Sequence, residues 1–350
     1  MKTYLFLLIL LLLNMFLTAH VHAEWELILD EKTYSIASDG ERLYAATDRG
    51  IRISLDDGDT WRWSDFKQPA KLLTGSPDAV YAYSRDHGIV RSVTKGNTWH
   101  PQNTDLKVRQ WENGRWVVRI PYIQQILVTG SGMIIAVAYH GGTWISRDRG
   151  DRWHEVTHEW IVALPNGDFP VGTGIYSMGE FDGYLWLLYS RSTTARSRDE
   201  GATWELIPDW VHDRTIYQFD RVNVWVEFRG DLYVAGDSGF GRWREEELEW
   251  ENLSHGLPDD PGLSSLVVHR DRIFAGSWRH GVFMFDHHAE MWHPAGLSVS
   301  VYANDLVSHR GVLYAAGAAR GHYGIYRADR PFVSPEGKTA VTWGAIKLER

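Results

Sequence analysis

Short apolar runs alternate with polar, glycine-containing loops along most of the chain. The first unit has an apolar run at residues 43–46, a polar loop at 47–50 and a second run at 51–53. The same order returns at residues 80–83, 84–88 and 89–91, and in each later unit. Runs this short, separated by turn residues, are typical of strands rather than helices. The pattern therefore predicts an all-β chain built from one repeated antiparallel unit.

A polar octet follows the second run in four of these units. It reads SLDDGDTW at residues 54–61, SRDRGDRW at 146–153 and SRDEGATW at 197–204, and a fourth copy, SVTKGNTW, occupies 92–99. In each complete copy the Asp is placed to accept hydrogen bonds from the turn's own N–H groups, the Gly permits a positive φ, and the Trp opens the next strand. The residues expected to form these structural turns are Asp56, Gly58, Trp61, Asp148, Gly150, Trp153, Asp199, Gly201 and Trp204.

The octet resembles the Asp-box, or BNR, repeat of sialidase-like β-propellers, a superfamily that includes photosystem II assembly factors and sortilin-like proteins. The resemblance implies a propeller of four-stranded antiparallel blades. It says little about activity, because in that family the Asp-box is a structural turn away from the active site.

The number of blades follows from the tryptophan at the end of each unit. The positions that fit are Trp25, Trp61, Trp99, Trp153, Trp204, Trp250 and Trp292. The last unit has no closing tryptophan, whereas residues 25–28 match residues 204–207 letter for letter. We therefore expect a single seven-bladed propeller over residues 24–327, in which the N-terminal strand completes the last blade and leaves no unpaired join. Residues 328–350 are expected to form a tail outside it.

Residues 1–23 have the pattern of a secretory signal peptide. Lys2 precedes an unbroken apolar run at residues 4–13, and small residues at 21–23 provide a cleavage site. The chain has no cysteine, so an exported protein of this sequence relies on packing rather than on disulfides. We expect a periplasmic, cell-surface or secreted protein from a bacterium, with no transmembrane segment after the signal is removed.

The spacing of the units leaves extra chain at residues 102–122 and 155–175. Both insertions join the outer strand of one blade to the inner strand of the next. In a propeller these connections share one face with the loops between second and third strands, which we call the loop face. The octet turns lie on the opposite face, which we call the turn face. Long loops on a rigid scaffold often carry function, so we expect the binding site on the loop face.

Composition and charge limit the kinds of partner that the chain is expected to bind. The formal net charge of -9 argues against nonspecific nucleic-acid binding. Arginine and histidine nevertheless gather in the loop-face loops, where guanidinium groups suit carboxylates, and tryptophans outside the repeat suit a sugar or a protein. The alternatives are solvated polar turns and tryptophans that pack the blades. The candidate ligand-binding residues are Arg49, Arg85, His87, Trp111, Trp116, Arg119, His140, Arg191, Asp237, Trp278, Arg279, His280, Arg320 and His322.

Arg119 carries a second resemblance. Residues 118–121 read VRIP, which is similar to the Arg-Ile-Pro motif with which an inner strand of sialidases supplies one of three arginines that hold the substrate carboxylate. The resemblance would make Arg119 a carboxylate ligand and the chain a sialidase-like glycoside hydrolase acting on acidic or plain polysaccharide. No acid Asp and no paired Tyr and Glu nucleophile are assigned by motif, so the catalytic residues stay unknown.

Signatures of cofactor and metal sites are missing from the sequence. There is no phosphate-binding loop and no dinucleotide-binding pattern. The histidine groups at 154 and 158, and at 287, 288 and 293, are not on a predicted helix and have no cysteine partner. We therefore expect no cofactor and no metal. The prediction is a noncatalytic, exported, monomeric binding or assembly module for a protein or glycan partner, including one that bears carboxylates. The hydrolase is the alternative, and a scaffold without a small-molecule site is a third possibility.

Overall fold

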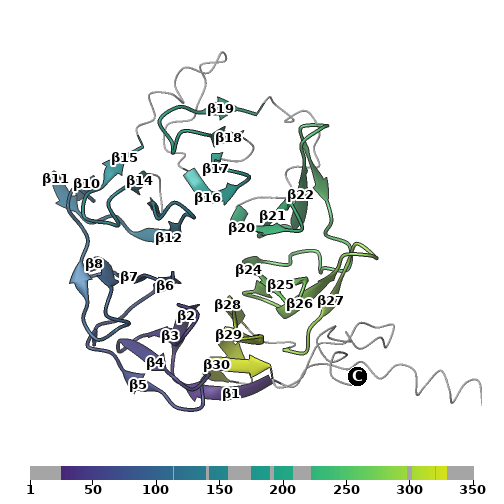
Figure 1. The fold of residues 1–350 in the computed structure, drawn as a ribbon, viewed down its shortest axis with the longest axis horizontal. Helices are drawn as coiled ribbons and strands as arrows, with labels where there is room; N and C mark the ends of the chain where they lie inside the picture. The colour runs from purple at the N-terminus through teal and green to yellow at the C-terminus, as the bar shows by residue number, and fades with distance from the viewer. Residues whose placement is uncertain are drawn as a thin grey trace, which may run out of the picture.

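The structure is a ring of sheets around a common axis (Figure 1). It is a computed structural model that describes residues 25–112, 114–138, 142–156, 175–189, 193–207, 222–297, 302–319 and 321–328. Within these ranges there are seven four-stranded antiparallel sheets, one two-stranded hairpin and no helix, hence no apolar helix long enough to cross a membrane. The predicted all-β, seven-bladed propeller is confirmed. The predicted signal peptide lies outside the described residues, and so does the predicted tail apart from Ala328, which is the last residue of β30.

The blades are numbered in chain order, and the strands of each are given from the axis outward. Blade 1 consists of β2 (Thr33–Ser38), β3 (Leu43–Thr47), β4 (Ile51–Ser54) and β5 (Arg62–Trp63), and blade 2 of β6 (Leu72–Gly75), β7 (Val80–Ser84), β8 (Gly88–Ser92) and β9 (His100–Pro101). Blade 3 consists of β12 (Ile123–Val128), β13 (Ile134–Ala138), β14 (Thr143–Ser146) and β15 (His154–Glu155), and blade 4 of β16 (Ile175–Phe181), β17 (Tyr184–Tyr189), β18 (Thr193–Ser197) and β19 (Glu205–Leu206). Blade 5 consists of β20 (Val222–Phe228), β21 (Asp231–Gly236), β22 (Phe240–Arg244) and β23 (Glu249–Asn252), and blade 6 of β24 (Leu263–His269), β25 (Arg272–Ser277), β26 (Gly281–Asp286) and β27 (Met291–Pro294). Blade 7 consists of β28 (Tyr302–His309), β29 (Val312–Ala319), β30 (His322–Ala328) and β1 (Trp25–Asp30).

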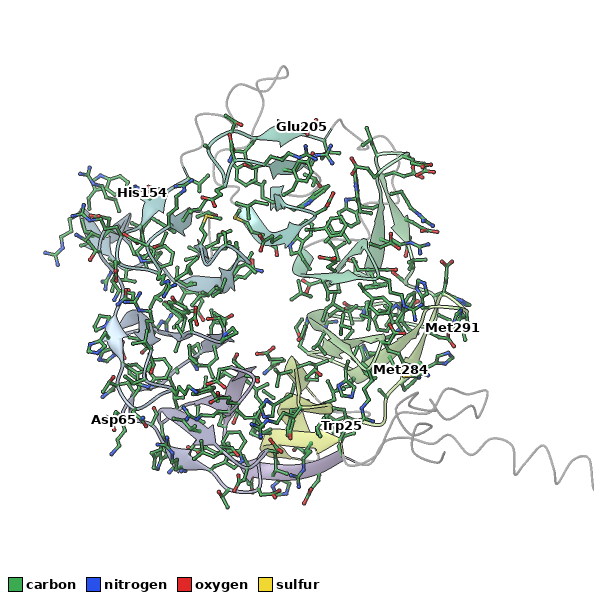
Figure 2. All side chains as sticks on the ribbon, in the orientation of Figure 1. Trp25, Asp65, His154, Glu205, Met284 and Met291 are labelled. Carbon is green, nitrogen blue, oxygen red and sulfur yellow. The ribbon has the colours of Figure 1, made fainter. Side chains whose placement is uncertain are left out.

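The N-terminal strand completes blade 7, as predicted. β1 runs antiparallel to β30, with Trp25 opposite Ala328 and Asp30 opposite Gly324. Trp25 lies at the rim of the ring (Figure 2), and its Nε1–H donates to the carbonyl oxygen of Ala295 in blade 6 at 2.9 Å. The first and last strands of the described chain thus meet in one sheet, which closes the ring.

Apolar side chains fill the spaces between neighbouring blades. Every residue of β3, β7 and β13, the second strands of blades 1 to 3, is buried. Since neighbouring blades cover both faces of such a strand, its sequence is a continuous apolar run rather than an alternating one. Closing tryptophans pack into the same spaces, and Trp153 and Trp292 are only 2% and 1% exposed.

The octets form the turns between third and fourth strands. In blade 1, the Ser54 hydroxyl accepts the Gly58 N–H at 2.8 Å. The Asp56 carboxylate accepts the Thr60 N–H at 2.9 Å and the Thr60 hydroxyl at 2.6 Å. The equivalent threonine hydroxyl and N–H in blade 4 hold the pKa of Asp199 at about 2, because these hydrogen bonds favour the charged carboxylate.

Blade 2 has Thr94 at the position of the octet carboxylate. Its hydroxyl accepts the Thr98 N–H at 2.8 Å and lies 2.7 Å from the Thr98 hydroxyl, so a neutral group makes the contacts that Asp56 makes with a charge. Because charge-assisted hydrogen bonds are stronger, we expect Thr94→Asp to raise the free energy of unfolding by about 0.5–1 kcal/mol. Urea denaturation should give a higher midpoint with an unchanged slope. Asp56→Thr should shift the midpoint the other way, and unchanged midpoints in both variants would contradict the prediction.

On several inner strands, the residue at one equivalent position forms a hydrogen bond to the next blade. We call these residues the inner-strand belt. Ser35 Oγ accepts the Leu73 N–H at 3.1 Å, and Gln125 Oε1 accepts the Met178 N–H at 3.0 Å. Ser177 Oγ accepts the indole N–H of a tryptophan in blade 5 at 2.7 Å. Each of these residues follows a register shift in its strand, where the local backbone turns away from regular pairing.

Asp305 occupies the belt position in blade 7 and joins it to both neighbours. Its Oδ2 accepts the Ser35 hydroxyl at 2.6 Å and the Ile36 N–H at 3.1 Å in blade 1. Its Oδ1 lies 3.4 Å from the hydroxyl of Ser265 in blade 6, which also accepts the Leu306 N–H at 2.9 Å. These partners are all neutral. Burial without a neighbouring cation raises the pKa of Asp305 to about 6, although the hydrogen bonds oppose the shift.

Candidate functional site

The loop face carries a hairpin inserted between blades 2 and 3. Its strands, β10 (Val108–Glu112) and β11 (Arg115–Arg119), lie at the outer edge of the ring beside blade 3 (Figure 1). Trp116 and Val118 are 66% and 62% exposed, and alternation along β11 puts them on one face of the hairpin. Trp111 pairs with Trp116 across the hairpin, but its side chain lies outside the described part of the chain.

Arg119 is the last residue of the hairpin strand β11. The inner strand of blade 3 begins only at Ile123, after the chain has left the hairpin. The resemblance that would make Arg119 a carboxylate ligand requires an inner strand, from which a side chain can reach the axis. Arg119 does not lie on an inner strand, so this part of the resemblance fails, and its role as a carboxylate ligand stays a prediction.

Two of the predicted arginines already have carboxylate partners. Arg49 Nε lies 3.0 Å from Oε1 of the buried Glu31, which also binds an arginine of β4. Arg279 forms an ion pair with Asp260, and its guanidinium lies 3.9 Å from the centre of the Trp278 ring. The charge of each of these arginines is therefore compensated within the protein.

The predicted histidines on this face also contact the protein itself. His280 Nε2 lies 3.0 Å from the carbonyl oxygen of Asp260, and His322 Nδ1 lies 3.3 Å from Asp30 Oδ2. His87 packs edge-on against Phe66, with the ring centres 5.6 Å apart. The three histidines come from blades 6, 7 and 2 and do not form one group.

The remaining candidates are spread around the ring. Arg85 lies over the ring of Tyr122, 5.4 Å from its centre, and Asp237 is half-buried with its carbonyl accepting the Gly262 N–H at 2.9 Å. The predicted site residues that lie outside the described residues are His140, Arg191 and Arg320.

Tyrosines and lysines form a loop-face group that sequence reasoning missed. Lys71 Nζ lies 3.1 Å from the centre of the Tyr34 ring, and Lys32 Nζ lies between Tyr34 and Tyr323, at 5.6 and 5.8 Å. Tyr302 and Tyr323 are both about half exposed. Lys32 and Lys71 stand in connections from fourth to first strands, which share the loop face. Apart from Trp111, Trp116 and Arg119 in the 102–122 insertion, the predicted site residues were all expected in the loops between second and third strands.

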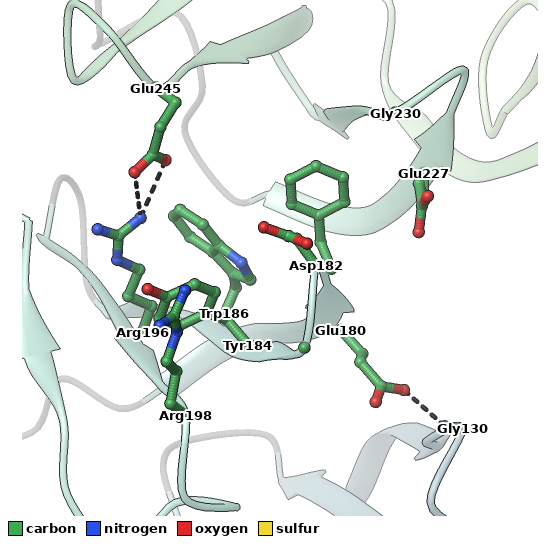
Figure 3. A pocket seen from close by; sticks show the side chains of 12 residues that line it. Gly130, Glu180, Asp182, Tyr184, Trp186, Arg196, Arg198, Glu227, Gly230 and Glu245 are labelled. Atoms are coloured by element: carbon green, nitrogen blue, oxygen red, sulfur yellow. Dashed lines mark hydrogen bonds and ion pairs between the residues drawn. The ribbon is translucent and has the colours of Figure 1, made fainter.

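The turn face contains a cavity of about 700 Å³ where blade 4 meets blade 5 (Figure 3). Tyr184 and Trp186 of β17 form part of its wall. Its charged lining is Glu180, Asp182, Arg196, Arg198, Glu227 and Glu245. None of these was predicted as a site residue, because they are far apart in sequence and lie on the face assigned to structural turns.

Arg196 and Arg198 play different parts in this cavity. Arg196 Nη1 lies 2.8 and 2.9 Å from the two carboxylate oxygens of Glu245, and its Nε lies 2.9 Å from Glu205 Oε2. The guanidinium of Arg198 lies 4.3 Å from the centre of the Tyr184 ring and forms no ion pair within the described residues. Arg198 is therefore the guanidinium that a ligand could engage.

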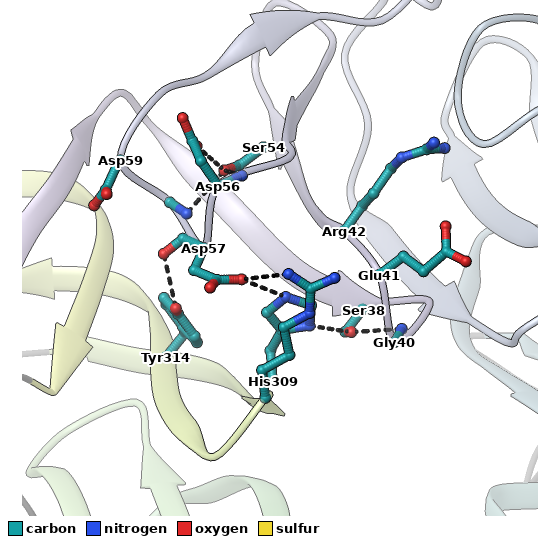
Figure 4. Close-up of polar contacts among 12 residues, drawn as sticks. Ser38, Gly40, Glu41, Arg42, Ser54, Asp56, Asp57, Asp59, His309 and Tyr314 are labelled. Atoms are coloured by element: carbon teal, nitrogen blue, oxygen red, sulfur yellow. Dashed lines mark hydrogen bonds and ion pairs between the residues drawn. The ribbon is translucent and has the colours of Figure 1, made fainter.

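A serine, a histidine and an aspartate meet on the turn face where blade 7 joins blade 1 (Figure 4). His309 Nδ1 lies 2.7 Å from Ser38 Oγ, and its Nε2 lies 3.1 Å from Asp57 Oδ1. Burial keeps the pKa of His309 below its usual value, although Asp57 opposes the shift. The order of the three groups is that of a hydrolase triad, which makes the site worth weighing as a catalytic centre.

The same serine–histidine contact recurs one blade earlier, where blade 6 joins blade 7. His269 Nδ1 lies 2.9 Å from Ser308 Oγ between blades 6 and 7, and burial lowers the pKa of His269 to about 4. In the first pair, the Ser38 hydroxyl also accepts the Gly40 N–H at 2.9 Å. A contact found at two successive joins is a packing feature of the repeat. We therefore assign these pairs a structural role, in which they hold neighbouring blades together.

No model of a known protein family matches the sequence, and no characterised protein matches it significantly. Among solved structures, YCF48 from Cyanidioschyzon merolae is similar, with a TM-score of 0.59 and 13% identity over 87% of this chain and 98% of that one. YCF48 bound to a D1 peptide gives a TM-score of 0.57 and 12% identity over 87% of this chain and 96% of that one.

A second kind of neighbour is the extracellular domain of a putative hybrid two-component system from B. thetaiotaomicron. It has a TM-score of 0.61 and 12% identity over 86% of this chain, which spans only 40% of that one. At these identities the likeness is one of fold. The chain is thus a seven-bladed propeller whose structural neighbours include YCF48 bound to a D1 peptide and the extracellular domain of a two-component system.

Proposed function

We propose that this chain is an exported, noncatalytic binding module that holds a segment of a protein partner on its loop face. One observation carries the proposal: Trp116 and Val118 stand on the same face of the β10–β11 hairpin and are 66% and 62% exposed. Exposed apolar side chains grouped on a rigid framework are typical of interaction surfaces, and tryptophan is enriched among the residues that carry binding energy.

The charge of the hairpin favours a partner that bears carboxylates. Its two strands contain Arg109, Arg115 and Arg119 but only one acidic residue, Glu112, in a chain whose formal net charge is -9. A basic patch on an acidic protein attracts and orients an acidic segment during encounter.

The comparisons support a protein partner and an exported setting. One structural neighbour is bound to a peptide, and another is an extracellular domain. A hydrolase has less support, because Arg119 belongs to the hairpin and the serine–histidine pairs recur as contacts between blades.

Photo-crosslinking tests this surface with a matched control. Benzoylphenylalanine is placed at Val118 on the hairpin in one variant and at Val93 on the turn face in the other, and the two sites are 62% and 56% exposed. In producing cells we expect a discrete adduct with one protein from the first variant only. Adding Trp116→Ala should weaken capture about tenfold or more. Equal adducts from both sites, or an adduct from Val93 alone, would contradict the proposal.

A glycan array with the same protein tests the sugar alternative. Binding to a defined glycan that Trp116→Ala abolishes would replace the protein partner with a sugar. Binding that survives this change would move the ligand to another surface.

A further inference from the structure

An aromatic residue opposite an arginine recurs on the middle strands of the blades. These cross-strand pairs are Tyr81–Arg91 in blade 2, Trp186–Arg196 in blade 4, Tyr233–Arg242 in blade 5 and Tyr314–Arg327 in blade 7. The Tyr314 hydroxyl donates to the carbonyl oxygen of Asp57 at 2.7 Å, and the Tyr81 hydroxyl to that of Arg149 at 3.2 Å. In both cases the acceptor is the positive-φ residue just before the glycine of the next blade's octet. The octet of one blade therefore satisfies the aromatic donor of the blade before it.

Within the described residues this contact is missing at two joins, for the Tyr233 hydroxyl where blade 5 meets blade 6 and for Trp186 where blade 4 meets blade 5, and the cavity lies at the second of these joins. The turn between β22 and β23, at residues 245–248, does not have the octet sequence. Trp186 is 1% exposed, and its Nε1 has no hydrogen-bond acceptor within the described residues. A buried donor without an acceptor is unfavourable, so an oxygen atom supplied at this place would be bound favourably.

The cavity opens at this same join, and its charges are separated by sign. Figure 3 shows the two arginines on one side of the Trp186 ring and Glu180, Asp182 and Glu227 on the other, with the ring nitrogen on the edge turned toward Asp182. Glu180 accepts the backbone N–H of a glycine in blade 3 at 2.6 Å. Asp182 and Glu227 are exposed and have no ion-pair partner within the described residues.

Four carboxylates and two guanidinium groups line the cavity, so its formal charge is 2 - 4 = -2. A ligand that fits must therefore be cationic at one end. It must also present an oxygen atom to the Trp186 Nε1–H, on the ring edge turned toward Asp182, and to the guanidinium of Arg198 on the other side of the ring, which forms no ion pair within the described residues. The contact of the cationic end with the carboxylates and the contact of the oxygen atom with Arg198 would both be charge-assisted hydrogen bonds, which are stronger than neutral ones.

We propose that this cavity binds arginine or lysine, with the cationic side chain against Asp182 and Glu227 and the carboxylate or carbonyl oxygen against Trp186 and Arg198. The cavity volume of about 700 Å³ is within the usual range of small-ligand sites, roughly 300–1,000 Å³. The same chemistry is offered by a free amino acid and by a basic residue within a peptide. The site lies on the turn face and does not depend on the partner proposed for the hairpin.

Calorimetric titration of the full chain tests the proposal. The ligands are L-arginine, its neutral isostere L-citrulline, N-acetyl-L-arginine amide and agmatine, which lacks the carboxylate. We expect L-arginine to bind at least about tenfold more tightly than L-citrulline, because a charge-assisted contact is lost. Tighter binding of the free amino acid assigns the site to a small molecule, and tighter binding of the blocked form assigns it to a peptide residue. No binding of any cationic ligand at millimolar concentration by the folded chain would overturn the proposal.

Three variants locate the binding. Asp182→Asn combined with Glu227→Gln changes two exposed side chains and should lower affinity for L-arginine at least about tenfold, whereas Asp259→Asn, an exposed carboxylate on the loop face, should not. Trp186→Phe removes only the N–H and should weaken L-arginine more than agmatine. Unchanged affinity in the double variant would overturn the proposal even if the buried Trp186→Phe variant fails to fold.

Discussion

Deletion of residues 25–30 is expected to abolish folding of the ring. These residues form β1, whose side chains pack at two joins: Trp25 and Leu27 between blades 6 and 7, and Ile28 and Leu29 between blades 7 and 1. A domain is stabilised by only about 5–15 kcal/mol in total, and a large apolar side chain contributes up to about 1.5–3 kcal/mol when buried. The deletion also leaves β30 as an unpaired edge that favours aggregation. Circular dichroism during heating should therefore give no cooperative transition.

A circular permutant provides the matched control for this deletion. Ala328 and Trp25 are partners at the end of the β30–β1 ladder, so a short turn can join them, with the new N-terminus at Glu31. This chain keeps β1 in place while changing its order in the sequence, and it should recover a cooperative transition. A deletion variant that unfolds at the same temperature as the parent would contradict the role assigned to β1.

In the parent chain, ionisation of Asp305 is expected to lower the free energy of unfolding as the pH rises from about 4 to 7. The variant Asp305→Asn should not show this loss. The pKa of Asp305 is about 6 in the folded chain, against an ordinary value of about 4 for an unfolded aspartate. Between these values the folded chain binds more protons than the unfolded chain, so this group's contribution is complete below pH 4 and is lost as the pH passes 6. The side chain is half-buried, and allowing for solvent the change is about 1–2 kcal/mol.

Urea denaturation at several pH values between 4 and 7.5 measures this effect. Asparagine keeps an oxygen acceptor for the Ile36 N–H and the Ser35 hydroxyl but cannot ionise. The difference in unfolding free energy between variant and parent should therefore move in favour of Asp305→Asn as the pH rises. The control Asp259→Asn changes an exposed carboxylate and should give a constant difference. A constant difference for Asp305→Asn would mean that this carboxylate has an ordinary pKa.

The architecture could be predicted because the repeat makes each blade depend on its neighbours in the same way. Strands such as β3 and β7 are covered on both faces, so they are continuous apolar runs that stand out between polar turns. The match between residues 25–28 and 204–207 identified the strand that closes the ring, because the same place in a blade calls for the same residues.

The site could not be predicted to the same extent, because charge compensation depends on contacts between loops. Arg49 and Arg279 looked like free ligands in sequence, but their partners Glu31 and Asp260 are 18 and 19 residues away in connections from fourth to first strands. The sequence did contain a signal for the cavity, namely the loss of the octet after β22. The consequence of this loss is seen only when Trp186 is compared with Tyr81 and Tyr314. The hydroxyls of these tyrosines have a hydrogen-bond acceptor, whereas Trp186 Nε1–H has none within the described residues.

The inner-strand belt is interrupted at two of the joins between blades. Its position is occupied by Leu72 in blade 2 and by Val224 in blade 5, and neither side chain can accept a hydrogen bond. Within the described residues the belt therefore forms two arcs, one of blades 6, 7, 1 and 2 and one of blades 3, 4 and 5. Apolar contacts have no preferred direction, whereas hydrogen bonds weaken steeply when they bend. At these two joins the belt does not fix the angle between neighbouring blades, which depends there on other contacts, such as the Tyr81 hydroxyl of blade 2 donating to the carbonyl oxygen of Arg149 in blade 3 at 3.2 Å. The hairpin is inserted in the chain at one of these joins, between blades 2 and 3.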